Sequence, residues 1–416
     1  MSGKTALRIF SLRDFRLFVF ARFFLTLAIL MQMSTISLQV YYEYSKDELL
    51  LGLLGLAEAL PSIGTSFFSG HFADILPKKR IILVAVFVLL AGAVFLFLNA
   101  QNGICFLRDL GLGALFLVVA VFGVTRSFLS ASTNPFMSQI VPRELYTSSA
   151  TWNSTAWHLG AILGPVIAGF MYGYRGGFHA NWCHFTEIIL FVLSLFFILQ
   201  IRHTGAPQGE KKETIFASMR QGVAFVFKTR MVLSAISLDL FAVLFGGAVA
   251  LIPPFTDKIL HLGPEAYGLL RTAPAIGAVA MALVMLVRPP SKKAGLALLW
   301  SVAAFGLFTI LFALSTNYWL AFFMLLLTGA FDNVSVVVRH SILQLMTPDS
   351  MRGRVSAINS IFIGSSNEIG AFESGLAARI LTLVPSIIFG GAMTIGVVLG
   401  INRLNPDLKK LDLTRI

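Results

Sequence analysis

The sequence predicts an all-α membrane protein in which twelve transmembrane helices form two pseudo-symmetric bundles of six. Three observations support this prediction: the composition, a series of long apolar runs and an internal repeat. The chain has 416 residues, of which 56% are hydrophobic and 12% are charged, and its mean hydropathy is +0.81. Because an average soluble domain carries about 25% charged residues, this composition indicates a protein that lies in a lipid bilayer.

Twelve apolar runs have the length of about 20 residues that a helix needs to cross a bilayer. They cover approximately residues 17–40, 49–72, 81–98, 112–132, 155–173, 185–201, 232–253, 267–287, 296–315, 318–338, 358–377 and 381–401. An even number of spans places both termini on one side of the membrane. The longest interior loop, residues 202–230, separates a first bundle (1–201) from a second (231–416).

The loop at 202–230 contains a helical pattern of its own. Ile215, Met219 and Val223 recur every four residues among basic side chains. This pattern is typical of a helix that lies in the membrane interface. The sequence leaves open whether that helix is a plain linker or has a regulatory role.

The basic residues indicate how the chain is oriented. The formal net charge is +12, but the bases lie in short gaps between apolar runs, so we expect no basic face for nucleic acid. Of the 32 Lys and Arg residues, 23 lie on the side of the termini and five on the opposite side. The positive-inside rule therefore places both termini in the cytoplasm.

The two halves of the chain resemble each other. GLAEALPSIG (55–64) aligns with GLLRTAPAIG (268–277) at an offset of 213, which puts Glu58 opposite Arg271. At an offset of 206, five pairs coincide: Arg126 with Asp332, Pro142 with Pro348, Asn153 with Asn359, Gly164 with Gly370, and Gly169 with Gly375. Parallel repeats of six spans imply a pseudo-twofold axis along the membrane normal, with a substrate path between the halves.

The loop after the second predicted span carries a family motif. The matching residues are Gly70, Asp74, Lys78, Lys79 and Arg80. Ile75 stands where the family has an arginine, and Pro77 where it has a second glycine. With this loop, twelve spans and a repeat of six plus six, the chain resembles the major facilitator superfamily of transporters over nearly its full length.

Three longer stretches are similar to the bacterial branch of that family that contains the enterobactin exporter and related drug-efflux permeases. They are LGLLGLAEALP followed by GHFAD, PRELYTSSATWNSTAWHLGAILGPVIAG, and PDSMRGRVSAINSIF. The resemblance implies proton-coupled export of a small amphiphilic compound, such as a drug or siderophore, across a bacterial inner membrane. We expect a monomer whose partners are the substrate, protons and the lipid bilayer. Import of a nutrient or lysolipid is one alternative, and a non-transporting sensor or scaffold is another.

The resemblance also implies a gate on the cytoplasmic side. In the family, the aspartate at Asp74 faces the start of span eleven, where unsatisfied N–H groups at a helix N-terminus favour a carboxylate. Arg352 and Arg354 lie just before that span and could supply the cation missing at Ile75. The gating residues would be Gly70, Asp74, Lys78, Lys79, Arg80, Arg352 and Arg354. An ordinary solvated loop is the alternative.

The fifth span resembles the glycine-proline motif of the family's antiporters. Its residues are Gly160, Gly164, Pro165 and Gly169. Small residues at every fourth position allow helices to approach closely, and a proline permits a bend. The motif favours an exporter, although tight packing alone would use the same residues.

Four charged residues lie in spans one, four, seven and ten, which line the central cavity in the family: Arg22, Arg126, Asp239 and Asp332. Charges at membrane depth are costly, so two bases from the first half and two acids from the second indicate ion pairs or a wet cavity. A substrate or coupling role and a structural cluster between the halves are equally open. Side chains that could add polar contacts are Gln32, Asn333 and Asn359.

Glu58 and Glu368 are the residues expected to carry protons. Each lies nine residues from the outer end of its predicted span, and spans two and eleven are neighbours in the family. Two nearby carboxylates in a low-dielectric medium do not easily both ionise, so one could hold and release a proton. Arg271 could instead neutralise one of them in a fixed ion pair.

The two cysteines, Cys105 and Cys183, lie with His179 and His184 in predicted outer loops. Free thiols are expected there, with a disulfide as the alternative. The sequence has no phosphate-binding loop, no catalytic-triad spacing and no zinc-ligand array. We therefore expect no enzymatic activity, no cofactor and no bound metal.

Overall fold

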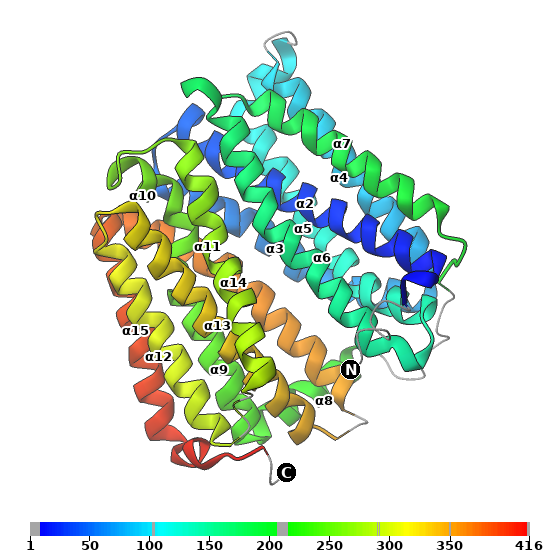
Figure 1. Ribbon diagram of the computed structural model, residues 1–416, viewed down its shortest axis with the longest axis vertical. Coiled ribbons are helices and arrows are strands. Elements are labelled where there is room, and N and C mark those ends of the chain that lie inside the picture. The colour runs from blue at the N-terminus through cyan, green and yellow to red at the C-terminus, as the bar shows by residue number, and fades with distance from the viewer. Residues whose placement is uncertain are drawn as a thin grey trace. The chain divides into compact units, whose positions relative to one another are not determined.

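The computed structural model describes residues 9–101, 105–205, 215–288, 290, 292–348 and 351–413 (Figure 1). Within these residues the chain is helical and forms no β-strand. The chain divides into two compact units. The first unit comprises Met1–Ser45, Ala57–Lys211 and Gly263–Gly268, and the second comprises Lys46–Leu56, Lys212–Leu262 and Leu269–Ile416.

Each of the twelve predicted spans corresponds to helical structure. The first six spans are α2 (Arg13–Gln39), α3 (Glu48–Ile75), α4 (Lys78–Ala100), α5 (Cys105–Ile140), α6 (Tyr146–Tyr172) and α7 (Ala180–Gln200). The last six are α9 (Arg230–Phe245) with α10 (Ile252–Lys258), α11 (Pro264–Val287), α12 (Ala294–Ala313), α13 (Tyr318–Met346), α14 (Arg352–Leu381) and α15 (Leu383–Leu404). A further helix, α8 (Ile215–Lys228), lies in the central loop, while residues 206–214 of that loop are outside the described residues.

The division into units differs from a simple cut at the central loop. Both α3 and α11 contribute residues to each unit. The start of α3 belongs with helices from the second half of the chain, and the start of α11 belongs with helices from the first half. Hydropathy alone cannot show this exchange, because it depends on which helices lie side by side.

The seventh span is interrupted, although the sequence predicts one continuous helix over residues 232–253. The chain ends α9 at Phe245, passes through Gly246 and Gly247, forms a 3-10 turn η5 (Ala248–Leu251), and continues as α10. Two adjacent glycines weaken a helix because they lose the most conformational freedom when it forms. Pro253 and Pro254 then stand in the first turn of α10, where no backbone N–H is needed.

Eleven helical segments of the described residues are long and apolar enough to cross a membrane. The remaining span, α14, has 30 residues but includes the polar run SSNE and a second glutamate, Glu373. A helix of 30 residues is about 45 Å long at 1.5 Å per residue, which is ample for a bilayer. The polar composition of α14 therefore indicates that part of this helix is surrounded by protein and not by lipid.

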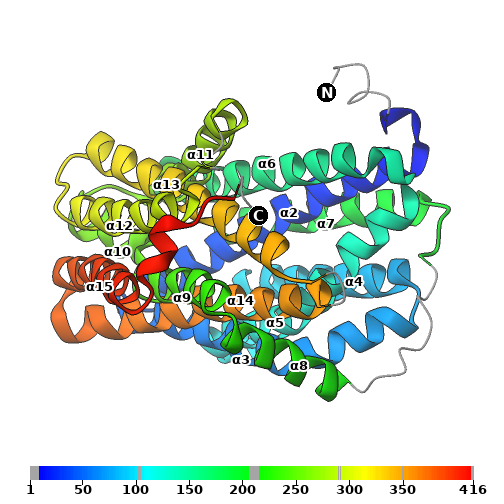
Figure 2. The ribbon, with the colours of Figure 1, turned by 90° about the horizontal axis from the view of Figure 1, so that it is seen from below.

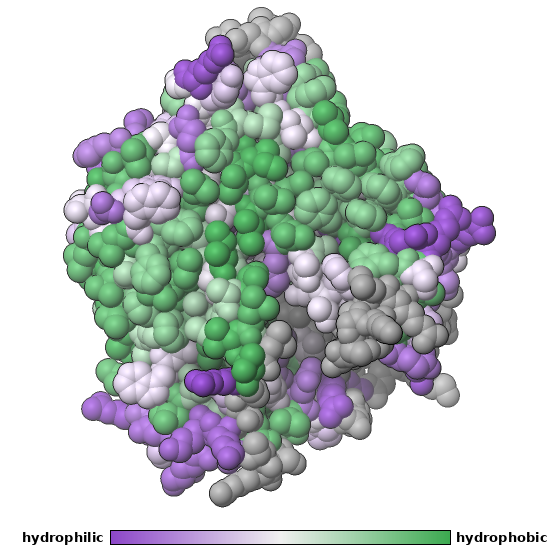
Figure 3. Space-filling model, viewed as in Figure 1, coloured by the Kyte–Doolittle hydropathy of each residue, from purple (hydrophilic) through white to green (hydrophobic). Residues whose placement is uncertain are grey.

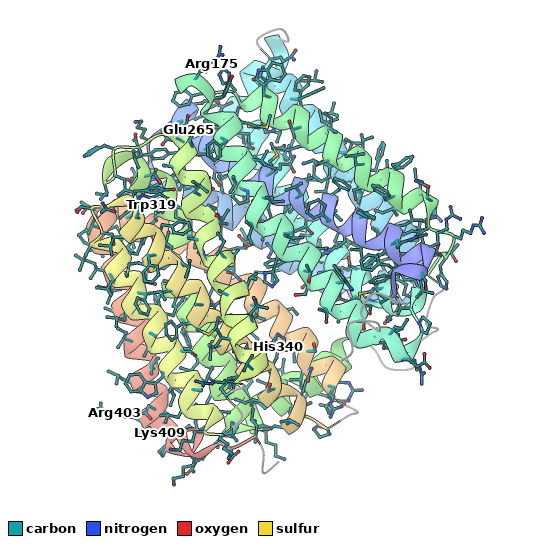
Figure 4. All side chains as sticks on the ribbon, in the orientation of Figure 1. Arg175, Glu265, Trp319, His340, Arg403 and Lys409 are labelled. Atoms are coloured by element: carbon teal, nitrogen blue, oxygen red, sulfur yellow. The ribbon has the colours of Figure 1, made fainter. Side chains whose placement is uncertain are left out.

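The surface of the second unit has the pattern of a bundle in lipid. Trp319 lies at one end of α13, and Arg403 and Lys409 lie at the opposite end of this unit, on α15 and η6 (Pro406–Lys410) (Figure 4). Between these ends the visible surface of α12, α13 and α15 is largely hydrophobic (Figure 3). Trp300 of α12 and Leu399 of α15 are exposed apolar side chains of this unit. Charges gathered at one end of an apolar surface agree with a membrane-spanning orientation.

In the first unit, α2 packs between α6 and α7 (Figures 1 and 2). Gly160 and Gly164 of α6 face α2 so closely that a Cβ atom at either position would lie 2.9 Å from Thr26 Cγ2 or from the Met31 nitrogen, respectively. The predicted small-residue motif of the fifth span is therefore a tight helix contact within this unit.

The internal repeat has a direct structural counterpart in two helix crossings. In the first unit, a Cβ at Gly169 of α6 would lie 2.8 Å from the Cα of Gly268 in α11. In the second unit, a Cβ at Gly375 of α14 would lie 2.8 Å from the Cα of Gly52 in α3. Gly169 and Gly375 are the pair that the offset of 206 superposes, so the same kind of crossing occurs once in each half of the repeat.

Candidate functional site

The first unit contains an ion pair at membrane depth between Glu58 of α3 and Arg126 of α5. Only 3% of the Glu58 side chain is exposed, whereas 44% of the Arg126 side chain is. The Glu58 carboxylate is therefore enclosed by protein, whereas the Arg126 side chain that pairs with it is partly exposed. The sequence placed these residues in two separate groups, the proton carriers and the cavity residues, and the structure brings them together.

Close packing of α3 and α5 explains why the pair forms. A Cβ at Gly123, one turn before Arg126, would lie 2.2 Å from the backbone oxygen of Glu58. One residue after Arg126, the Ser127 hydroxyl hydrogen-bonds the Ser69 hydroxyl of α3 at 2.9 Å. The missing side chain at Gly123 lets the two helices touch at the level of the pair, and the serines hold their register.

The second unit contains an ion pair between Asp239 of α9 and Arg339 of α13, and both side chains are at most 5% exposed. The sequence left open whether Asp239 joins a cluster with bases from the first half of the chain or faces a wet cavity. In the structure its partner, Arg339, comes from the same unit and not from the first half. Arg339 was missed as a site residue, although it lies seven residues after Asp332 and hence on the same face of α13.

Several other predicted cavity residues have polar atoms with no partner among the described residues. They are Arg22 Nε, both amide atoms of Gln32, and Asn359 Oδ1, all of them buried. Asn333 makes a weak contact of 4.0 Å with the Met285 sulfur, and Asp332 is half-buried. Buried polar atoms are normally hydrogen-bonded, so Gln32 on α2 and Asn359 on α14 are unusual positions in this fold.

The other two predicted coupling residues lie in the second unit. Glu368 is half-buried on α14, and a Cβ at Gly55 would lie 2.7 Å from its backbone oxygen. Arg271 is half-buried on α11 and makes no ion pair among the described residues. In the first unit the cation paired with Glu58 is Arg126, and neutralisation of either glutamate by Arg271 stays a prediction.

Two of the predicted gating residues connect α4 to the end of α7. The backbone N–H groups of Lys78 and Lys79 donate to the carbonyls of Gly205 and Thr204 at 3.0 and 3.3 Å. The Lys79 ammonium also donates to the Ile201 carbonyl at 2.6 Å. These contacts satisfy free donors at the start of α4 and free carbonyls at the end of α7.

The other predicted gating residues have varied surroundings. A Cβ at Gly70 would meet no atom within 4 Å, so packing in this structure does not require glycine there. Arg354, in the first turn of α14, donates to the Gln221 side chain of α8 at 2.5 Å. Arg352 begins α14, and Asp74 lies in the last turn of α3.

A buried His184–Glu187 pair on α7 was missed by the sequence analysis. His184 Nδ1 lies 2.9 Å from Glu187 Oε2, and neither side chain is exposed. The sequence placed His184 in an outer loop because it started this span at residue 185, whereas α7 starts at Ala180. The signal was a histidine and a glutamate three residues apart, which lie on one face of a helix.

The same helix carries Cys183, which is buried and has a free thiol, as predicted. Its thiol lies 3.7 Å from the Ala168 carbonyl of α6. The side chain of Cys105 is outside the described residues. No group of three or more metal-ligating side chains occurs among the residues that were described.

A second missed cluster consists of three ion pairs at the predicted outer end of the second unit. Lys46 pairs with Asp257 at 2.7 Å, and Glu48 pairs with Lys258 at 2.5 Å. Asp47, between them, pairs with Arg379 of α14 at 2.9 Å. The charged run Lys46–Asp47–Glu48 is visible in the sequence, but its partners are not.

The chain matches the family model of the Major Facilitator Superfamily over residues 18–370. It is similar to the Enterobactin exporter EntS of Escherichia coli O1:K1 / APEC and to that of Shigella boydii serotype 18. Each is 25% identical over 332 residues, which are 79% of this chain and 77% of the relative.

Solved structures of low sequence identity share the fold. A POT family transporter has a TM-score of 0.74 at 14% identity, covering 95% of this chain and 96% of that one. The nucleoside transporter NupG has a TM-score of 0.70 at 14% identity, covering 94% and 98%. A bacterial homologue of the human lysosomal transporter Spinster has a TM-score of 0.68 at 13% identity, covering 96% and 97%. The chain therefore belongs to the major facilitator superfamily, a family of transporters and not of enzymes, and it resembles the enterobactin exporter branch.

Proposed function

We propose that this transporter is a proton-coupled exporter of a small amphiphilic compound that works by alternating access in a bacterial inner membrane. The direction of transport is supported by the enterobactin exporters, which align with 79% of the chain. The substrate class, a compound with apolar and polar parts such as a siderophore or drug, comes from the same resemblance.

The Glu58–Arg126 pair is the observation that carries the proposed coupling. An exporter driven by protons must let a proton and a substrate compete for one site, so that binding of one releases the other. Glu58 is a carboxylate at membrane depth, where ionisable groups are usually functional. In the proposed cycle, the Glu58 carboxylate binds either a proton or a cationic or hydrogen-bond-donating group of the substrate. When neither is bound, the carboxylate pairs with Arg126.

The remaining candidates extend this proposal. The candidates for polar contacts with the substrate are Arg22 and Gln32 in the first unit, and Asp332, Asn333 and Asn359 in the second. Gln32 and Asn359 have buried polar atoms that lack partners among the described residues. Glu368 and Arg271 would form a second charged pair in the coupling step. Asp239 is assigned a structural role, because Arg339 neutralises it in a site that excludes solvent.

Transport is tested first in cells. Cells with and without the gene are loaded with a panel of amphiphilic compounds that includes enterobactin, before and after the proton gradient is collapsed. An exporter lowers the accumulation of at least one compound, and collapse of the gradient removes the difference. Higher accumulation with the gene would indicate an importer, and binding without flux would indicate a sensor.

Coupling is then tested in proteoliposomes. Substrate-driven proton movement is compared between the wild type, Glu58→Gln and Glu368→Gln. We expect Glu58→Gln to abolish proton movement, because an amide cannot take up a proton at neutral pH. Undiminished coupling in both variants would remove the proposed role of these glutamates.

A further inference from the structure

Five side chains of the first unit form a continuous line of hydrogen bonds that ends at a buried carboxylate. His184 Nδ1 lies 2.9 Å from Glu187 Oε2, and His184 Nε2 lies 3.3 Å from Gln39 Oε1. Gln39 Nε2 donates to Glu43 Oε2 at 3.0 Å. The Tyr172 hydroxyl donates to the other oxygen of Glu43 at 2.8 Å. The line thus runs from α7 through α2 to the segment that follows it.

The line connects the interior of the unit with its surface. His184 and Glu187 are 0% exposed and Gln39 is 2% exposed, whereas Glu43 is exposed. Glu187 Oε1 is buried and accepts no hydrogen bond from the described residues. Keeping an ionised carboxylate in such an enclosed site is costly unless a cation or a protonated group lies next to it.

The backbone around Glu43 departs from a regular α-helix. Residues Val40–Tyr44 form a π-helical turn, η2, in which the Ser45 N–H donates to the Val40 carbonyl five residues earlier at 3.1 Å. Such turns often occur at functional sites. This one turns the end of α2 so that Glu43 meets both Gln39 and Tyr172.

Each contact in the line needs one hydrogen. Gln39 donates an amide N–H to Glu43, so its oxygen accepts from His184 Nε2–H. The contact between His184 Nδ1 and Glu187 Oε2 then needs a proton on either the nitrogen or the oxygen. Without that proton, a nitrogen lone pair would face a carboxylate oxygen at 2.9 Å, which is repulsive. This arrangement therefore holds a proton at the buried pair.

Rotation of the Gln39 amide by half a turn gives a second arrangement with the same number of protons. The amide N–H then donates to His184 Nε2, and Nδ1–H donates to the Glu187 carboxylate. Glu43 carries the other proton and donates it to the amide oxygen. Between the two arrangements an N–H bond breaks at His184 Nε2 and an O–H bond forms at Glu43, so the total charge does not change.

We propose that these residues form a proton route between the buried His184–Glu187 pair and the end of α2 that the positive-inside rule places outside. Chains of histidine and acidic side chains serve as proton relays in membrane transporters, and histidine changes its protonation near neutral pH. The inference rests on the proposed proton coupling and adds to it a proton entry that is separate from Glu58.

The charged and titratable surroundings of the pair are few. On α7 itself the neighbour is the Cys183 thiol. The helix α6 contributes the Tyr172 hydroxyl, and η2 contributes Glu43. The helix α4 also packs against α7, but its only charged residues are the three bases in its first turn, Lys78–Lys79–Arg80. The helix α2 carries Arg13, Arg16 and Arg22, but among the described residues Glu187 makes an ion pair with His184 and with no arginine or lysine. A proton, and not a cation, therefore satisfies the contact between His184 and Glu187.

The test uses purified full-length protein in detergent and protons as the only ligand. Infrared difference spectra between acidic and alkaline pH record the carbonyl stretch of protonated carboxyl groups. Glu187→Gln and Glu43→Gln are each expected to lose or shift a band of the wild type, and to release about one proton fewer per molecule. Thr186→Val, a neighbour on α7 outside the line, is the matched control and should keep the wild-type spectrum and proton count.

Gln39→Leu tests the connection between the two ends. It keeps both carboxyl groups but breaks the line, so proton release after a pH jump should become slower while the total number released stays the same. Wild-type spectra in both glutamate variants, or an unchanged release rate in Gln39→Leu, would overturn the inference. If Glu187→Gln fails to fold by size-exclusion chromatography, Glu43→Gln at the exposed end and Gln39→Leu still decide the outcome.

These measurements need no transported compound, so they separate the inference from the proposed function. A wild type that moves protons with substrate, but whose glutamate variants titrate normally, keeps the proposed function and loses the route. A wild type that moves no protons with any exported compound loses the proposed coupling, whatever the spectra show.

Discussion

Glu58 and Arg126 form an ion pair whose two members differ in exposure by more than tenfold, 3% for the glutamate and 44% for the arginine. Removing the charge of Glu58 and removing the charge of Arg126 should therefore have different consequences. A carboxylate that loses its cation stays in a low-dielectric site, whereas a half-exposed guanidinium that loses its carboxylate can turn to solvent. The pair thus makes a directional prediction about stability as well as about coupling.

We expect Arg126→Gln to destabilise the protein more than Glu58→Gln does. The loss for Arg126→Gln should be about 1–3 kcal/mol, the cost of a buried polar group that loses its partner. The double variant should be more stable than Arg126→Gln alone, because it also removes the carboxylate that has lost the Arg126 guanidinium. Thermal unfolding in detergent measures all three, and equal losses in the two single variants would contradict this account of the pair.

The glycine at the α3–α5 crossing gives a second prediction. In Gly123→Ala the new methyl group would lie 2.2 Å from the Glu58 carbonyl, so the helices must separate, at a cost of about 1–3 kcal/mol. Substrate-driven proton movement should fall with it, since Glu58 shifts relative to Arg126. Gly113→Ala in the same helix meets no atom within 4 Å and should be neutral or stabilising by up to about 1 kcal/mol. Similar unfolding temperatures for both variants would count against this contact.

The order of the spans could be predicted because eleven of them are apolar runs of membrane length among the described residues, and the repeat and the family resemblance indicated the more polar α14. The ends of the helices could not, since polar residues near a helix terminus look like loop in a hydropathy pattern. For this reason the hydropathy pattern predicts a span that begins at residue 185 and leaves His184 in a loop, whereas α7 begins at Ala180. The break at Gly246 and Gly247 was also missed, because a glycine pair is compatible with either a bend or a continuous membrane helix.

Which charged residues form ion pairs inside the helix bundles could be predicted better than which partners they meet. Glu58, Arg126 and Asp239 were singled out because ionisable residues at lipid depth are rare. Their partners depend on the rotation of each helix about its axis and on small residues such as Gly123, which a single sequence does not reveal. Two gating candidates, Lys78 and Lys79, have contacts with the end of α7 that the family motif does not imply.

The Asp239–Arg339 pair should respond differently from the pair in the first unit. Both side chains are at most 5% exposed, so Asp239→Asn and Arg339→Gln should each cost about 3–5 kcal/mol. The double variant Asp239→Asn/Arg339→Met removes both charges and should recover most of that loss. Unfolding temperature and transport are measured together: a stable double variant that no longer transports would show that the pair also acts in transport.

The ion pairs at the predicted outer end of the second unit provide a test by charge exchange. Lys46 pairs with Asp257, and Lys258 pairs with Glu48. The Lys46–Glu48 segment and the end of α10 therefore each contribute one base and one acid to these two pairs. Lys46→Asp would face Asp257 with a like charge and should destabilise the protein, whereas the exchange Lys46→Asp/Asp257→Lys restores an attractive pair. Because the lysines are 57% and 40% exposed, each effect should be about 1 kcal/mol or less.

High salt should reduce the difference between the single variant and the exchanged pair, since exposed charges are screened. Lys409→Asp is the control, because Lys409 is exposed and makes no ion pair among the described residues. Unfolding temperatures at low and high ionic strength distinguish the variants. If the exchanged pair is no more stable than Lys46→Asp at low salt, the contact with Asp257 contributes nothing to this unit, and the position of the Lys46–Glu48 segment depends on its other contacts: the ion pairs of Asp47 with Arg379 and of Glu48 with Lys258, and the glycine contact between Gly52 and Gly375.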